Sequence, residues 1–175
     1  MSSRESLAAL VLLAVAGCAS APVERTVTRP LLPDLAELSQ GSAPRVKILF
    51  LDEGRTVDWR TCETVLSLLA KKGYRATVAS AVECRDHSQA ENDLGHWIDQ
   101  GELLLVIEAS TELLTIPGQT DADGWPHRWT PRLATWLYRR EEMALVYAAE
   151  ASFTERAGDA TRLVEPVLDG LPNVR

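Results

Sequence analysis

A cysteine and three histidines are the residues whose types could support metal or nucleophile chemistry. Cys84 stands three residues before His87, and His96 follows several acidic side chains. Two ligands leave a tetrahedral metal site incomplete, and no histidines share the HExxH spacing of helical zinc sites. Cys84 and His87 could also pair as a thiolate and its base, but a disulfide at Cys84 would abolish that pair. We therefore predict no metal ligands, no cofactor and no catalytic residues.

The other common catalytic patterns are missing from the sequence. No serine lies in a GxSxG or SxxK motif, and the ten glycines form neither GxGxxG nor GxxxxGK[ST]. Carboxylate pairs such as Asp52 and Glu53 are explained by loop and capping roles. Because α/β proteins place their sites at the carboxyl edge of the sheet, a hydrolase with a site near Asp52 remains an alternative.

A long segment rich in Trp, Pro and Gly carries the strongest binding signal. The sequence IPGQTDADGWPHRWTPR, residues 116–132, contains a predicted loop over 116–131, and long loops are often functional. Trp and Arg anchor many binding hot spots. We predict a binding loop that uses Trp125, His127, Arg128 and Trp129. The alternative is that both indoles fold back over the sheet as a structural lid.

The N-terminal residues have the pattern of an export signal. An apolar run of ten residues, 7–16, follows Arg4. A membrane-spanning helix needs about 20 residues, so the run fits the apolar region of a signal peptide instead. It ends in Val15-Ala16-Gly17-Cys18, which resembles the lipobox of bacterial lipoproteins. The resemblance implies that residues 1–17 are removed and that Cys18 is lipidated, with acyl chains such as palmitate anchoring the protein to the membrane.

The lipobox resemblance and the net charge together limit the expected cellular location and the expected classes of binding partner. Ala19 follows the lipobox cysteine, which by resemblance to Gram-negative lipoprotein sorting implies the outer membrane, facing the periplasm. Removal of residues 1–17 takes away Arg4 and Glu5, so the net charge stays at −7. An acidic chain repels phosphate backbones, so we expect no nucleic-acid partner. We expect the membrane and an envelope protein as partners and leave the oligomeric state open.

If Cys18 is lipidated, Cys62 and Cys84 remain in an oxidising compartment. Both would lie at the same end of a predicted parallel β-α-β unit. A disulfide between them, which would stabilise the fold by about 3 kcal/mol, is therefore one alternative. The other is a buried thiol at Cys62 and an exposed thiol at Cys84.

Hydrophobic patterning predicts one α/β domain over residues 45–175, after a Pro-containing tether over residues 18–44. We expect a mixed sheet in the element order β-α-β-α-β-β-β-α with helices packed on it. Trp59, Trp97 and Trp136 fall within predicted elements and are expected to be core or half-buried. The expected elements are strands 46–52, 74–80 and 102–110, a hairpin of 132–139 with 143–153, and three helices, one between Asp58 and Gly73 and two over 91–100 and 159–170.

The sequence thus favours a membrane-anchored lipoprotein that acts as a non-catalytic binding or assembly module of the cell envelope. Two alternatives stay open. One is an envelope hydrolase with its site at the carboxyl edge of the sheet. The other is a carrier of lipids or small molecules, which would need a sizeable apolar cavity.

Overall fold

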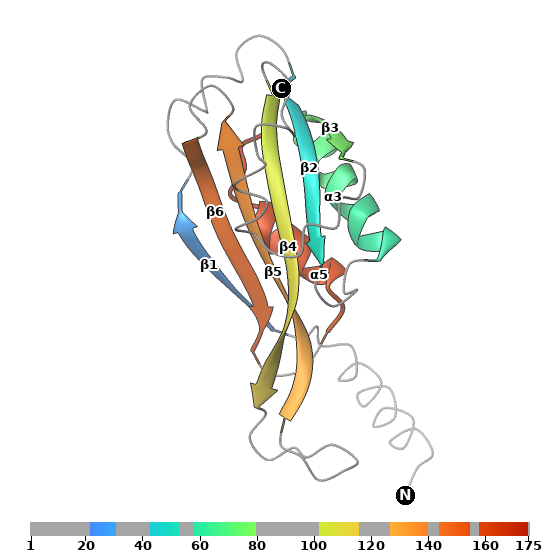
Figure 1. Ribbon diagram of the computed structural model, residues 1–175, viewed down its shortest axis with the longest axis vertical. Helices are drawn as coiled ribbons and strands as arrows, with labels where there is room; N and C mark the ends of the chain where they lie inside the picture. Colours follow the sequence, from blue (N-terminus) through green and yellow to red (C-terminus); the bar gives the residue numbers. More distant parts are fainter. Residues whose placement is uncertain are drawn as a thin grey trace, which may run out of the picture.

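One mixed β-sheet organises the part of the chain that the computed structural model describes, which is residues 22–30, 43–52, 58–79, 102–115, 127–139, 144–154 and 158–174. Its six strands lie in the order β1-β6-β5-β4-β2-β3 (Figure 1). The elements are β1 (Val23–Arg29), β2 (Arg45–Asp52), α3 (Trp59–Lys71), β3 (Arg75–Val78), β4 (Glu102–Thr115), β5 (His127–Arg139), β6 (Ala144–Phe153) and α5 (Thr161–Leu168). The predicted mixed sheet with helices packed on it is confirmed.

The strand directions divide the sheet into two parts. β2 is parallel to both β3 and β4, as a β-α-β unit requires, whereas β4, β5, β6 and β1 follow one another antiparallel. Helices α3 and α5 contact each other and cover one face of the sheet (Figure 1). A second cluster of buried residues, which includes Leu104 and Val106, lies on the other face. The strand over residues 102–110 is therefore buried on both faces, as its unbroken apolar run indicates.

Helix α3 begins and ends as the sequence predicts. The carboxylate of Asp58 accepts hydrogen bonds from the backbone N–H and the hydroxyl of Thr61, both at 2.9 Å. These bonds, led by the one from the backbone N–H, lower the pKa of Asp58 below its usual 3.8. At the other end Gly73 has a φ of +94°, a left-handed conformation that glycine adopts without strain. A side chain at Gly73 would also collide with the carbonyl oxygen of Val174.

One stripe of side chains on α3 is buried. Thr61, Val65 and Leu69 are its fully buried residues, whereas Cys62 and Leu66 are only half-buried. The Thr61 hydroxyl, which lies 3.3 Å from that of Thr161, can be buried because it has hydrogen-bond partners.

The prediction of an unbroken tether over residues 18–44 is wrong for Val23–Arg29. These residues form β1, which pairs with β6 at an edge of the sheet. Only Val23 and Arg25 are half-buried, and the rest of the strand is exposed. An edge strand with so little buried surface carries a weak hydrophobic signal, so the sequence pattern resembles a polar linker.

Strands β4 and β5 are longer than predicted. Residues 127–131, expected in a loop, form the start of β5, and 111–115 extend β4. Pro131 fits within β5 because β6 pairs with β5 only from Arg132 onward, so its missing N–H breaks no bond to β6.

Other predictions fall partly outside the described residues. The structure does not describe the expected helix over 91–100 or any of residues 1–21. The full predicted element order therefore stays a prediction. Helix α5 contains Pro166 and ends two residues later, at Leu168. Within the described ranges, neither helix is long and apolar enough to cross a membrane.

Candidate functional site

The outer parts of β4 and β5 form a two-stranded ribbon that extends beyond the sheet. β2 pairs with β4 only as far as Asp52 and Ala109, and β6 pairs with β5 only from Ser152 and Arg132. Beyond these positions, residues 111–115 and 127–131 pair with one another and with no other described strand. Figure 1 shows this ribbon leaving the body of the sheet at one end. We call these residues the ribbon.

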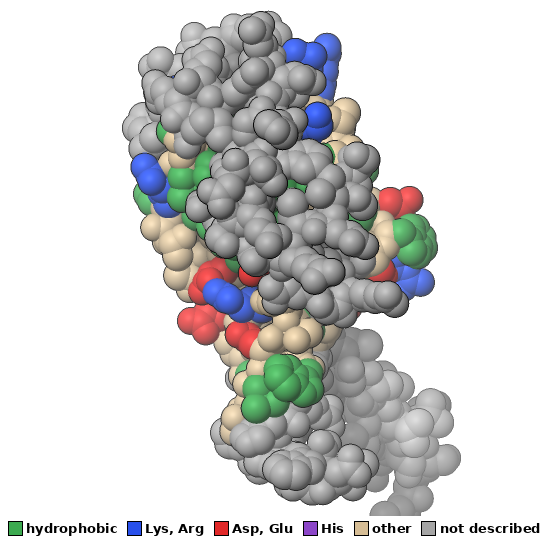
Figure 2. Space-filling view, in the orientation of Figure 1, with side chains coloured by type: hydrophobic (Ala, Val, Ile, Leu, Met, Phe, Trp, Pro, Cys, Tyr) green, Lys and Arg blue, Asp and Glu red, His purple; other side chains and the backbone are tan. Residues whose placement is uncertain are grey.

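Two large apolar side chains of the ribbon are exposed as a cross-strand pair. Leu113 and Trp129 are register partners, and they are 51% and 69% exposed. Directly opposed residues in a sheet project to the same face, so the two side chains are neighbours. Figure 2 shows a patch of hydrophobic side chains where the ribbon extends from the body. The pair contributes little to the core and is available for contact with another molecule.

Of the four predicted binding residues, only Trp129 has a described side chain. Trp125 and the segment 116–126 lie outside the described residues. His127 and Arg128 belong to β5, but their side chains are not described. Trp129 is exposed, so it does not fold over the sheet as a lid. Binding by these residues stays a prediction.

Leu113 is a candidate contact residue that the sequence reasoning missed. It lies in β4, beyond the end of the strand predicted over 102–110. The apolar run continues through ELLT, but only the antiparallel register places Leu113 opposite Trp129. An extended hairpin in place of the loop could have been recognised only by testing that register.

Charged side chains separate the exposed pair from the body of the sheet. Arg132 and Glu150 form an ion pair across β5 and β6, and about a third of each side chain is exposed. Glu108 and Glu112 on β4 are half-buried. Figure 2 shows acidic and basic side chains gathered on this part of the surface, next to the hydrophobic patch. The ribbon therefore has an apolar pair at its outer part and a charged base.

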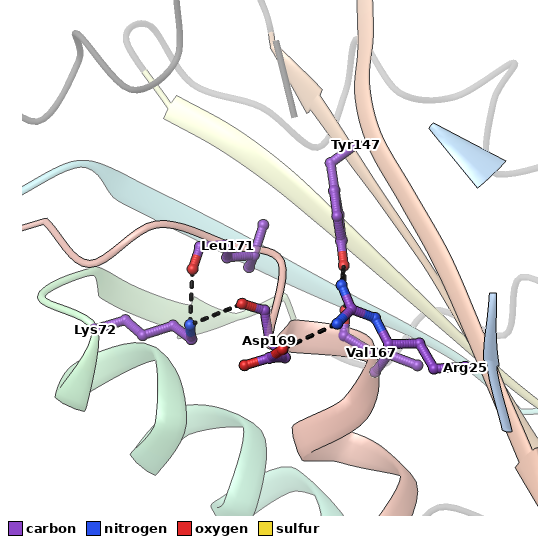
Figure 3. Close-up of polar contacts among 6 residues, drawn as sticks. All are labelled: Arg25, Lys72, Tyr147, Val167, Asp169 and Leu171. Atoms are coloured by element: carbon purple, nitrogen blue, oxygen red, sulfur yellow. Dashed lines mark hydrogen bonds and ion pairs between the residues drawn. The ribbon is translucent and has the colours of Figure 1, made fainter. Parts of the chain in front are cut away.

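A second polar feature, a pocket, lies between β1 and α5. It is lined by Arg25, Arg162, Glu165, Pro166 and Asp169. Arg25 donates a hydrogen bond from Nη1 to the Asp169 carboxylate at 2.9 Å. Its Nη2 lies 3.5 Å from the Tyr147 hydroxyl (Figure 3).

The groups around this pocket hold the fold together. The Tyr147 hydroxyl donates to the carbonyl of Val167 at 3.0 Å, and the Lys72 ammonium donates to the carbonyl of Leu171 at 2.7 Å (Figure 3). Burial raises the pKa of Tyr147, while the Arg25 guanidinium opposes that shift, so the phenol stays protonated at neutral pH. The cluster ties edge strand β1 to the end of α5, and its geometry offers no activated nucleophile.

The remaining sequence candidates are not brought together by the described residues. Asp52 ends β2, but its side chain is not described, and Glu53 lies outside the described ranges. Cys62 is half-buried on α3, while Cys18 and Cys84 lie outside, so lipidation and the disulfide stay predictions. Within the described ranges, no three His, Cys, Asp or Glu side chains are placed to hold a metal ion.

The prediction for Trp59 is wrong. Its side chain is 65% exposed at the first turn of α3, and the Arg60 guanidinium lies 5.6 Å from the centre of its ring. The apolar stripe of the helix runs through Thr61 and Val65, which turns Trp59 to solvent. Trp136 is half-buried, as predicted, and Trp97 is outside the described residues.

The fold and the ribbon define a mixed-sheet domain with helices on one face and an extended β-hairpin. No family model matches the chain, and no curated protein matches it in sequence. Its fold is similar to that of a PelC dodecamer from Paraburkholderia phytofirmans, with a TM-score of 0.50 and 16% identity over 89% of this chain and 100% of the PelC chain. A single-residue variant of that PelC gives a TM-score of 0.49 and 18% identity over the same shares.

A weaker likeness is to TolB from Acinetobacter baumannii. It has a TM-score of 0.41 and 11% identity, and it covers 86% of this chain but 31% of the TolB chain. At these identities the comparison with PelC shows a shared fold and nothing about activity or assembly.

Proposed function

We propose that this protein is a lipid-anchored, non-catalytic binding or assembly module of the bacterial cell envelope, held at the outer membrane and facing the periplasm. The lipobox resemblance at Val15-Ala16-Gly17-Cys18 supports the anchor. The observation that carries the binding role is the exposed Leu113–Trp129 pair on the ribbon. These two side chains contribute little to the core, so they are available for contact with another envelope component.

The body of the domain has the features of a rigid scaffold for the ribbon. Thr135 on β5 donates its hydroxyl to the carbonyl of Val106 on β4, and Tyr147 donates to Val167. These hydrogen-bonded polar groups stabilise the packing of strands and helices in the body of the domain. The predicted helix over 91–100 would complete the proposed α/β order.

The two alternatives receive less support. A hydrolase would need an acid, a base or a nucleophile converging in a pocket. In the described pocket, Arg25 and Asp169 of the lining are paired with each other. A carrier would need a large apolar cavity. Leu103, Leu105 and Ile107 instead pack within the core beneath the helices.

Chemical crosslinking in cells tests the proposal. Wild-type protein, Cys18→Ala, and the double variant Leu113→Ser with Trp129→Ser are compared after membrane fractionation. We expect Cys18→Ala to leave the membrane fraction or to be misprocessed, and the double variant to stay there with its main crosslinked adduct, whether to protein or to phospholipid, lost. Val78→Ser is the matched control, since Val78 is also exposed, at 44%, on a different strand. Unchanged membrane retention of Cys18→Ala would refute the anchor, and unchanged adducts in the double variant would refute binding by the ribbon.

A further inference from the structure

The start of β1 and the base of the ribbon lie at the same end of the sheet. Val23 pairs with Phe153 at the end of β6, and the preceding residue, Ser152, pairs with Arg132. Arg132 is the residue from which β5 continues outward into the ribbon. Figure 1 shows β1 beginning beside the point where β4 and β5 leave the body. The chain that precedes Val23 therefore joins the domain at the ribbon end.

Chain length limits how far the anchor can be from this end. Cys18 stands five residues before Val23. Even a fully extended chain of that length spans at most about 18 Å. The five residues of β5 beyond Arg132 extend the ribbon by roughly 17 Å, and Trp129 lies about 10 Å beyond Arg132. A bilayer that holds acyl chains on Cys18 is therefore within reach of the ribbon.

The chemistry of the ribbon suits the surface of a bilayer. Tryptophan is favoured at membrane–water interfaces, where its ring is buried among headgroups and its N–H still finds a partner. Leu113 adds apolar area beside Trp129. Glu112 and the Arg132–Glu150 pair follow closely, and charges are costly in hydrocarbon, so the body stays in water. With a net charge of −7, the attraction would come from these apolar side chains rather than from anionic lipids.

We propose that the Leu113–Trp129 pair is a second membrane contact, inserted among the headgroups of the same leaflet that holds the acylated Cys18. This inference rests on the proposed function and names the lipid surface as the component that the ribbon binds. Two separate contacts fix the orientation of the domain relative to the bilayer, which one short tether cannot do. The pocket and the helices then face the periplasm in a defined direction.

Photo-crosslinking of the full-length protein in Gram-negative cells tests this contact. Benzoylphenylalanine replaces Trp129 in one variant and Val78 in another, and adducts are identified by mass spectrometry after illumination. Val78 lies on β3 at the level of Leu105, about 27 Å along the strands from Leu113. Both positions are exposed, so both variants are expected to fold, which a thermal melt verifies. We expect at least tenfold more phospholipid adduct from position 129 than from position 78.

The outcomes separate the two proposals. A protein adduct that predominates at position 129, or lipid adducts that are no more frequent there than at position 78, would overturn the membrane contact. The mass of the N-terminal peptide gives the acylation state in the same sample. An unacylated Cys18 would refute the lipoprotein function and the inference that rests on it. An acylated protein without the excess of lipid adducts at position 129 would refute only the membrane contact.

Discussion

The inner and outer halves of the β4–β5 pair have similar residues but different environments. In the inner half, Leu105 and Ile107 are completely buried, with neighbouring strands on both sides and helices over one face. In the outer half, Leu113 and Trp129 continue the same ladder with most of their surface exposed. Apolar side chains stabilise a fold only where other elements cover them. The same strand therefore serves as core at one end and as a contact surface at the other.

The largest expected contrast is between two leucines of β4. Leu105→Ala removes a buried side chain and leaves a cavity, so we expect it to lower the free energy of unfolding by about 2 to 5 kcal/mol. Leu113→Ala, on the exposed ribbon, should change it by less than about 0.5 kcal/mol. Urea denaturation of both variants measures the difference. Equal losses would mean that the ribbon belongs to the cooperative core.

A smaller contrast concerns two threonines. The Thr135 hydroxyl donates to the carbonyl of Val106 at 3.2 Å inside the core. Thr135→Val removes that bond and should cost about 1 kcal/mol of unfolding free energy. Thr111→Val is the matched change at an exposed position where the ribbon begins, and it should be nearly neutral. A neutral Thr135→Val would show that this bond adds nothing to the inner half.

The cap of α3 extends the comparison to pH, because buried residues of α3 belong to the same core cluster as Leu105 and Ile107. The folded pKa of Asp58 is below its usual 3.8, so its stabilising contribution is complete above that value. The contribution is lost as the pH falls through the lowered folded pKa. Asp58→Asn keeps a capping side chain without the charge. We therefore expect the advantage of wild type over Asp58→Asn, measured by urea midpoints, to diminish below pH 3.8. An advantage that is independent of pH would contradict this assignment.

The ribbon pair itself should contribute little to stability. The double variant Leu113→Ser with Trp129→Ser should unfold within about 1 kcal/mol of wild type, since each exposed position contributes at most about 0.5 kcal/mol. Its main adduct in the chemical crosslinking experiment should nevertheless be lost. Calorimetry of the double variant and of Val78→Ser checks the first expectation. A much larger destabilisation would make the pair structural and would weaken the binding proposal.

Local rules were sufficient for several parts of the fold. Asp58 and Gly73 mark the ends of α3 because a capping carboxylate and a left-handed residue act on the nearest turn of the chain. The parallel pairing of β2 with β3 follows from the helix between them, and the β5–β6 hairpin follows from its short connection. Each of these predictions depends on residues that are close in sequence.

The sequence by itself determined where α3 begins and ends, which strands are buried, the lipobox resemblance and the choice of Trp129 as a candidate binding residue. Tertiary structure decided that Val23–Arg29 joins the sheet. Its partner β6 lies more than a hundred residues later in the chain, and the polar sequence of Val23–Arg29 does not indicate this pairing. It also decided that Leu113 lies opposite Trp129, since antiparallel register depends on the whole hairpin rather than on either residue. Periodicity shows which residues are apolar, but only the assembled sheet determines which of them remain uncovered.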